Sequence, residues 1–199
     1  MTFVNTIPEE EASGELQRLY EENLESHGFI PNYVRAFSHR PEVMFAWGNL
    51  LGTIKSNMDT RRYELVTLAA ARALRSSYCM LAHSSVLLDQ FYTSEQLIEI
   101  ATDYHTADLA PADVAMMAFA EKVVRAATAI TQADVDDLKQ HGFSDAEIFD
   151  IIAAAAARCF LSKTADALGA EPDEVFLEMN EALRQTLVIG RPIAGQSKP

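Results

Sequence analysis

Two side chains with nucleophilic and acid–base chemistry stand four residues apart, Cys79 and His83. In a helix this spacing places both on the same face. The first turn of a helix presents free N–H groups and the positive end of the helix dipole, which favour a thiolate over a thiol. Ser76 is a suitable N-cap, because its hydroxyl can accept a hydrogen bond from an amide of that turn. The pattern therefore predicts a reactive cysteine at the start of a helix.

A carboxylate stands on the helix predicted just before this one. Glu64 lies between Tyr63 and Leu65 in a largely apolar run. Such a carboxylate is either at a solvated edge or paired and functional, and we favour the second. Glu64 reaches Cys79 only if the two helices fold back on each other. Tyr78 is expected to pack, with a hydroxyl contact in the same pocket.

Each of these residues also has an ordinary structural interpretation. A single cysteine more often packs as a small apolar side chain than acts as a nucleophile, and a lone histidine often sits satisfied in a core. The combination of Cys79 with His83 one turn later favours the reactive interpretation. The second cysteine, Cys159, follows Arg158 in an apolar run and is expected to be buried and structural.

The composition is typical of one helical domain. The chain has 199 residues, 49% of them hydrophobic, with 8 glycines and 7 prolines. Apolar residues recur at helical spacing and no alternating strand pattern is found. We predict a single all-α domain over residues 1–199 with about ten helices, a core over about 8–187, and a disordered tail over 190–199.

Start and stop signals give the expected helix boundaries. Thr93 with Gln96 and Ser144 with Glu147 are capping-box patterns. Residues 104–110 are expected to form a loop that carries a surface histidine, His105. The expected helices run from Pro8 to Gly28, from about Phe29 to His39, from Pro41, from Asp59 or Thr60 to Arg75, from Ser76 to Gln90, from Thr93, from Pro111 to Ala129, from Thr131 to Gly142, from Ser144 to Gly169 and from Pro172 to Leu187.

An internal similarity raises the alternative of two similar helical halves. Shifted by 86 residues, the run 63–72 lies over 149–158, and Ser76 lies over Ser162. Cys79 and His83 then match an alanine and a glycine, so only the first copy carries the chemistry. A chance likeness between alanine-rich helices explains the match equally well.

Charge and motif content exclude several classes of partner. A net charge of −13 disfavours nucleic acid and is typical of a soluble protein. Two cysteines provide no disulfide framework, and we expect a reducing, cytoplasmic location. The start resembles no signal peptide, and no apolar run is long enough to span a membrane. We expect no metal and no cofactor, because zinc-ligand spacings, phosphate loops and dinucleotide fingerprints are missing.

The residues around Cys79 resemble the active-site motif of the alkylhydroperoxidase D-like and carboxymuconolactone decarboxylase superfamily. That motif has a glutamate, then Cys-x-x-Cys, then a histidine four residues past the second cysteine, and residues 76–84 match its latter half. Residues 29–42 and 164–169 are similar to segments of the peroxidase-related members. The resemblance covers roughly residues 20–180. It implies an all-α fold, a small-molecule substrate and a homo-oligomer.

The resemblance also implies roles for individual residues. Cys79 matches the peroxidatic thiol, His83 its base, and Glu64 the group that orients the histidine or relays protons. Ser76 stands where the family's peroxidases have the resolving cysteine, and Tyr78 stands where some have a histidine. A sulfenic acid formed at Cys79 would therefore need an external thiol reductant, since Ser76 cannot form a disulfide.

Three functions are compatible with these residues. The first is a peroxidase-type oxidoreductase that reduces hydroperoxides through Cys79 alone. The second is a decarboxylase or hydrolase acting on a lactone or small acid, because the decarboxylase branch of the family works without the cysteine pair. The third is a member of the fold that has lost catalysis and serves in binding or assembly.

Overall fold

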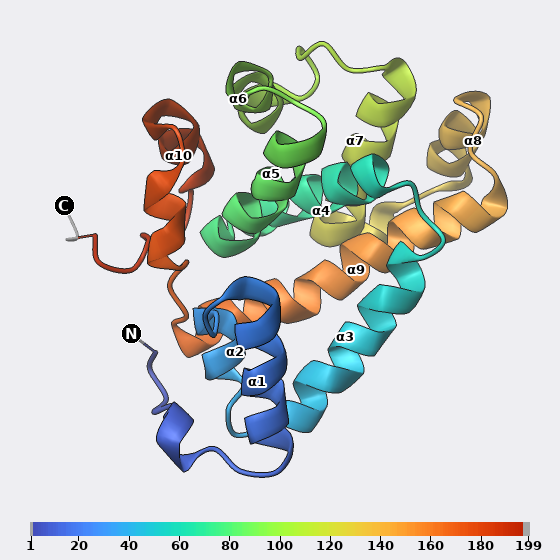
Figure 1. Cartoon of the computed structure of the whole chain (residues 1–199). Coiled ribbons are helices and arrows are strands. Elements are labelled where there is room, and N and C mark those ends of the chain that lie inside the picture. The colour runs from blue at the N-terminus through green and yellow to red at the C-terminus, as the bar shows by residue number, and fades with distance from the viewer. Residues whose placement is uncertain (1, 197–199) are drawn as a thin grey trace.

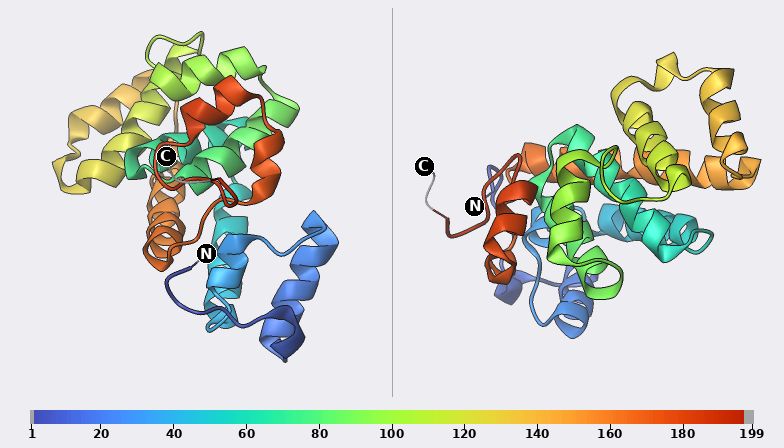
Figure 2. Two further views of the ribbon diagram at one scale, coloured as in Figure 1. Left: turned by 90° about the vertical axis from the view of Figure 1, so that its left-hand side faces the viewer. Right: turned by 90° about the horizontal axis from the view of Figure 1, so that it is seen from above.

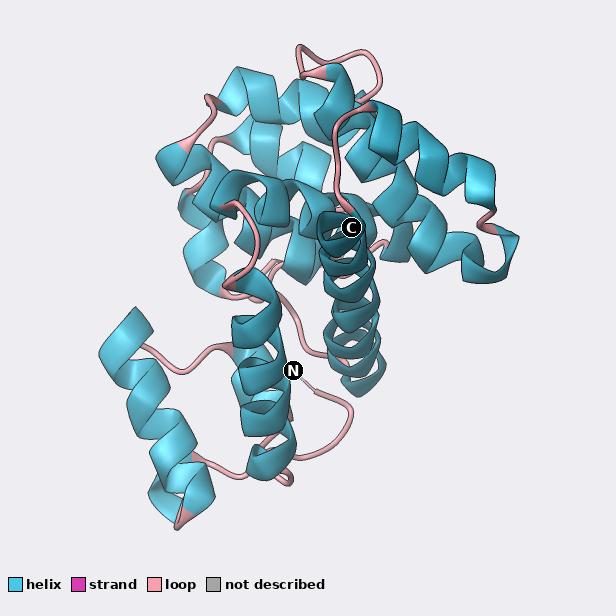
Figure 3. Cartoon of the chain, turned by 90° about the vertical axis from the view of Figure 1, so that its right-hand side faces the viewer, coloured by secondary structure: helices cyan, strands magenta, loops and turns pink. Residues whose placement is uncertain are grey.

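The computed structural model of the protein describes residues 2–196 and is all-α, as predicted. Within that range only helices, turns and loops are found (Figure 3). The ten α-helices of the described range are α1 (Glu15–His27), α2 (Asn32–Ala36), α3 (Pro41–Lys55), α4 (Thr60–Leu74), α5 (Ser77–Gln90), α6 (Ser94–Asp103), α7 (Pro111–Ala126), α8 (Gln132–Gln140), α9 (Asp145–Leu168) and α10 (Glu181–Leu187).

Helix α4 forms the centre of the core. The side chain of Asp59 accepts a hydrogen bond from the Arg62 amide and caps the helix, as predicted. Every residue from Tyr63 to Ala71 is buried, because α5, α7 and α9 all pack against α4 (Figure 1). The helix ends at Arg75, which has a left-handed backbone with φ of 57°. This turn folds α5 back against α4, the condition for Glu64 to reach the residues on α5.

Helix α9 is the long helix that supplies the far wall of the site. A capping box of Ser144 and Glu147 starts it, as predicted, and Gly169 ends it in a left-handed conformation. With α7 and α8 it builds one end of the molecule (Figure 2). It continues through Ser162, whereas the chain breaks at the matching Ser76. The two segments of the suggested repeat therefore differ in structure.

Two predicted helix starts were wrong. Pro8 precedes only the 3-10 turn Glu9–Glu11, and α1 begins after Gly14, whose φ of 59° redirects the chain. Pro172 does not open the last helix either. Asp173 accepts hydrogen bonds from the Asn32 amide and the Tyr78 hydroxyl, so contacts with distant residues hold this segment. A 3-10 turn, Glu174–Glu178, follows before α10.

Residues 190–196 pack against the domain, unlike the disordered tail expected from Gly190. Ile193 is fully buried, and the Gly190 amide donates a hydrogen bond of 2.7 Å to Ser77 Oγ. A Cβ on Gly190 would lie 2.1 Å from the Arg75 carbonyl oxygen, so the chain approaches the α4–α5 turn as only glycine allows. The remainder of the predicted tail, residues 197–199, lies outside the described range. Within that range no helix is long and apolar enough to cross a membrane.

Candidate active site

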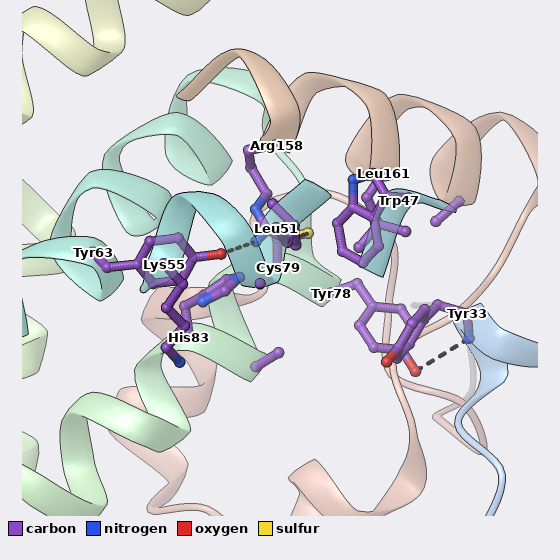
Figure 4. Close-up of a pocket in the computed structure, with 13 residues that line it drawn as sticks. Tyr33, Trp47, Leu51, Lys55, Tyr63, Tyr78, Cys79, His83, Arg158 and Leu161 are labelled. Carbon is purple, nitrogen blue, oxygen red and sulfur yellow. Dashed lines mark hydrogen bonds between the residues drawn. The ribbon is translucent and has the colours of Figure 1, made fainter. Parts of the chain in front are cut away.

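Cys79 and His83 line one pocket of about 290 Å³, walled by helices α2, α3, α4, α5 and α9 (Figure 4). Its volume is near the lower end of the range for small-molecule sites. The walls are mostly aromatic and aliphatic, with two cations among them. The lining residues are Tyr33, Trp47, Leu51, Gly52, Lys55, Tyr63, Tyr78, Cys79, Ala82, His83, Arg158, Leu161 and Ala165.

Cys79 is the third residue of α5, at the helix start that the sequence predicted. Its side chain is buried, and two donors from α9 face its sulfur. Ser162 Oγ donates a hydrogen bond of 3.1 Å to Sγ, and Arg158 Nη1 lies 3.9 Å from Sγ. A cation and a hydroxyl donor favour the charged form of a sulfur. Ser162 and Arg158 are thus the polar groups of the described chain that contact the sulfur.

Ser76 occupies the N-cap position of α5, as expected. Its backbone is extended, and its carbonyl accepts the Met80 amide. However, its hydroxyl makes no capping hydrogen bond, so the predicted side-chain cap was wrong. The first-turn amides are left without that acceptor. The fixed donors that face Cys79 come from α9 instead.

Buried Glu64 and half-buried His83 form a hydrogen-bonded pair at the pocket. His83 Nδ1 lies 2.5 Å from Glu64 Oε2, and Lys55 Nζ donates to Glu64 Oε1 over 3.1 Å. Glu64 is 1% exposed, and although burial opposes ionisation, the hydrogen bond with His83 and the charge of Lys55 lower the pKa of its carboxyl. An ionised Glu64 accepts a hydrogen bond from the Nδ1–H group of His83. The proton therefore stays on Nδ1, and Nε2 is the basic nitrogen of the ring.

His83 is neutral at pH 7. Burial and the charge of Arg158 lower the pKa of His83 from 6.5 to about 4, against the opposing effect of Glu64. A neutral imidazole supplies no positive charge to the Cys79 sulfur. Cys79 and His83 also form no hydrogen bond with each other within the described chain. The cation beside the sulfur is Arg158.

Arg158 has an unusual environment for a buried guanidinium. It is 3% exposed, and Nη2 donates to the Tyr63 hydroxyl over 3.4 Å. Its guanidinium carbon lies 5.6 Å from the centre of the Trp47 ring. Among the described residues it forms no ion pair, and its Nε has no hydrogen-bond partner. Burying a cation is costly without a counter-charge, so an anion is expected at this point of the pocket.

The sequence reasoning missed Arg158, Ser162 and Lys55. Arg158 interrupts an apolar run of α9 as Glu64 interrupts that of α4, and the same reasoning applied to both helices would have singled it out. Ser162 and Lys55 lie far from Cys79 in the sequence, and no local pattern marks them.

The remaining predicted residues lie as follows. Tyr78 lines the pocket, and its hydroxyl donates to Asp173 and accepts from the Tyr33 amide. Burial and Asp173 raise the pKa of Tyr78, so its hydroxyl stays protonated. Cys159 is half-buried rather than fully buried, lies outside the pocket, and donates to the Ala155 carbonyl.

Comparisons with known proteins agree with this fold. The model of the Carboxymuconolactone decarboxylase family matches residues 41–122, from α3 into α7. A peroxidase-related protein of Ralstonia eutropha with an alkylhydroperoxidase AhpD core is 26% identical, with a TM-score of 0.79 over 89% of this chain and 95% of the other. The match to the family model thus covers α3 to the first part of α7, and the fold of the AhpD-core protein extends over most of the chain.

Two further solved structures share the fold. A peroxidase-related protein from Silicibacter sp. is 22% identical, with a TM-score of 0.74 over 88% of this chain and 91% of the other. The debrominase Bmp8, as a cysteine-to-alanine variant in complex with 2,3,4-tribromopyrrole, is 20% identical, with a TM-score of 0.71 over 94% and 96%. The fold thus hosts more than one activity. A search of the curated proteins found no match.

Proposed function

We propose that this protein is a peroxidase-type oxidoreductase that reduces hydroperoxides through the single cysteine Cys79 and uses an external thiol as reductant. The observation that supports it best is the position of the Cys79 sulfur, which faces a pocket, accepts from Ser162 and lies beside an otherwise unpaired guanidinium. Such surroundings are typical of reactive cysteines rather than structural ones.

The first step oxidises the sulfur. The Cys79 thiolate attacks the terminal oxygen of the hydroperoxide, so an S–O bond forms as the O–O bond breaks. The sulfur loses two electrons and becomes a sulfenic acid, and the alkoxide leaves. Nε2 of His83 relays a proton from water to the alkoxide, while Glu64 holds Nδ1–H and fixes the ring.

An external thiol completes the cycle. Ser76 cannot act as a resolving residue, and Cys159 is outside the pocket. One external thiolate attacks the sulfenic sulfur, releasing hydroxide that is protonated to water, and a mixed disulfide forms. A second thiolate then attacks the external sulfur of that disulfide and frees Cys79. The sum converts one hydroperoxide and two thiols into an alcohol, water and a disulfide.

Brief peroxide treatment followed by dimedone labelling and mass spectrometry tests this proposal. We expect label on Cys79 in the wild type, and thiol-dependent peroxide consumption that Cys79→Ala abolishes. His83→Gln should slow consumption about a hundredfold, as for loss of a general acid–base group. Cys159→Ala is the matched control and should keep full activity. Equal consumption by the wild type and Cys79→Ala would overturn the proposal.

A second candidate is a decarboxylase or hydrolase acting on a lactone or small acid. The observation that favours it is the Glu64–His83 pair, which holds a neutral imidazole at the pocket without a hydrogen bond to Cys79. Turnover of such a substrate that needs His83 and survives in Cys79→Ala would support this function over the first. If neither variant changed any turnover, the chain would be a silent member of the fold.

We propose that the working form is a homo-oligomer. Two large apolar side chains near the pocket stay exposed in the single chain, Leu50 at 53% and Phe160 at 43%. Exposed apolar side chains beside a site are common at subunit contacts. Size-exclusion chromatography with light scattering should give a mass of at least twice 22.0 kDa, and a monomer at micromolar concentration would refute it.

A further inference from the structure

In the proposed function Cys79 reacts as a thiolate, and its sulfur lies beside the unpaired guanidinium of Arg158. Lys55 is paired with Glu64, and His83 is neutral. The nearby carboxylate of Asp173 already accepts from Tyr78 and Asn32 and forms no ion pair with Arg158 in the described chain. Arg158 is left with the Cys79 sulfur, 3.9 Å from Nη1, as its counter-charge.

Oxidation removes this counter-charge. A sulfenic acid is neutral at pH 7, whereas a guanidinium stays charged in proteins. The oxidised site therefore holds a buried cation, 3% exposed, whose Nε already lacks a partner within the described chain. A buried cation without an anion is unfavourable, so oxidation should increase the affinity of the pocket for anions.

We propose that the oxidised pocket selects an acidic thiol as its reductant, with the carboxylate of that thiol paired to Arg158. This inference rests on the proposed function and names the class of its second substrate. The attacking thiolate forms the S–S bond and expels hydroxide, which is protonated to water. The mixed disulfide is neutral at the sulfur, and the bound carboxylate replaces the lost charge beside Arg158.

The aromatic walls support a small reductant rather than a large one. Trp47, Tyr33 and Tyr78 line the pocket (Figure 4), and its volume of about 290 Å³ admits an acid of a few carbon atoms beside the sulfur. Lys55, whose side chain is 45% exposed, lines the same pocket, but its charge is paired with Glu64, so Arg158 is the cation that faces an incoming anion. The whole protein has a net charge of −13, so the positive charge at the pocket is opposite in sign to that of the molecule.

The kinetic arm of the test uses three small thiols of similar size and different charge. Sulfenic Cys79 is reduced with mercaptoacetate, mercaptoethanol or cysteamine, and each rate constant is corrected for the thiolate fraction. We expect mercaptoacetate to react about tenfold faster than mercaptoethanol, the factor for one charge-assisted hydrogen bond, and cysteamine to be slowest. Arg158→Gln should remove the preference and Arg158→Lys should restore part of it. Equal rates, or a preference for cysteamine, would overturn the proposal.

The equilibrium arm needs no peroxide chemistry. In Cys79→Ser the site is permanently neutral at this atom, as in the sulfenic acid. Calorimetry should show benzoate binding to Cys79→Ser about tenfold tighter than to the reduced wild type, with no such gain for the isosteric neutral benzamide. The gain should vanish in Cys79→Ser combined with Arg158→Gln. If benzoate binds both proteins equally or neither, the proposal fails. If peroxide leaves no sulfenic acid, the proposed function fails, and this arm still decides the anion site.

Discussion

His83 Nδ1 lies 2.5 Å from Glu64 Oε2, a contact that joins α5 to α4 next to the Cys79 pocket. Glu64 is buried and His83 is half-buried, and the contact places a neutral imidazole beside an ionised carboxylate. Both the stability of the helix pair and the chemistry of the pocket depend on these protonation states. The contact therefore makes a prediction about pH.

Acidification should destabilise the protein through His83. The pKa of His83 is about 4 in the fold and near 6.5 in the unfolded chain, so only the unfolded chain gains this proton in between. The free energy of unfolding should fall by up to about 3 kcal/mol as the pH decreases from about 6.5 to about 4. The lowered pKa of Glu64 acts in the same direction, because its stabilisation is lost once the carboxylate is protonated.

Urea unfolding at a series of pH values measures this effect. His83→Gln should flatten the dependence of the unfolding free energy on pH in that window. His105→Gln is the matched control, since His105 is exposed and should leave the dependence unchanged. Identical pH profiles for the wild type and His83→Gln would contradict the assignment of a neutral His83.

Removing the guanidinium of Arg158 should lower the reactivity of Cys79 without unfolding the protein. Arg158→Met keeps an unbranched apolar side chain and removes a buried charge, so thermal stability should stay the same or rise. Alkylation of Cys79 by iodoacetamide at neutral pH should slow about tenfold, because the thiolate loses its nearest cation. Cys159 is alkylated in the same sample and serves as an internal control. An unchanged rate at Cys79 would show that Arg158 does not act on the sulfur.

Gly190 should tolerate no side chain. A Cβ there would lie 2.1 Å from the Arg75 carbonyl oxygen, so Gly190→Ala should destabilise the protein by about 1–3 kcal/mol. Gly48 in α3 has no heavy atom within 4 Å of a Cβ, so Gly48→Ala should instead stabilise it by about 0.5–1 kcal/mol. Thermal unfolding of both variants tests the pair of predictions. Equal stability of the two would mean that the C-terminal segment is not held against the turn.

Ser76→Cys should install a resolving thiol. The new cysteine lies one turn before Cys79, in the spacing of the family motif. After one equivalent of peroxide, we expect an internal disulfide between the two, seen as the loss of two hydrogens in intact mass. Turnover should then depend on a dithiol reductant. Persistence of dimedone-reactive sulfenic acid in this variant would show that the geometry forbids the disulfide.

The sequence predicted the parts of the site that depend on local spacing. Cys79 and His83 share a helix, and the predicted break at Arg75 to Ser77 is the turn that brings Glu64 to them. Helix caps such as Asp59 and Ser144 were found because their partners lie three residues away.

The sequence did not reveal contacts between distant segments. Ser162 reaches Cys79 across 83 positions, and Asp173 reaches Asn32 across 141. Both follow from how α9 and the segment after it lie on the bundle, which no local pattern encodes. The prediction that Pro172 opens the last helix failed for the same reason. The contacts of Asp173 with distant residues outweigh the preference of proline for a helix start.

The hydrogen bonds between the C-terminal segment and the α4–α5 turn have a consequence for biosynthesis. Ser77 Oγ accepts from the amide of a residue 113 positions later, and Arg75 donates to the carbonyl of Ile189. A nascent polypeptide emerging from the ribosome carries its nucleophile long before these bonds can form. Until residue 190 has been added, the turn that precedes Cys79 lacks both of these hydrogen bonds.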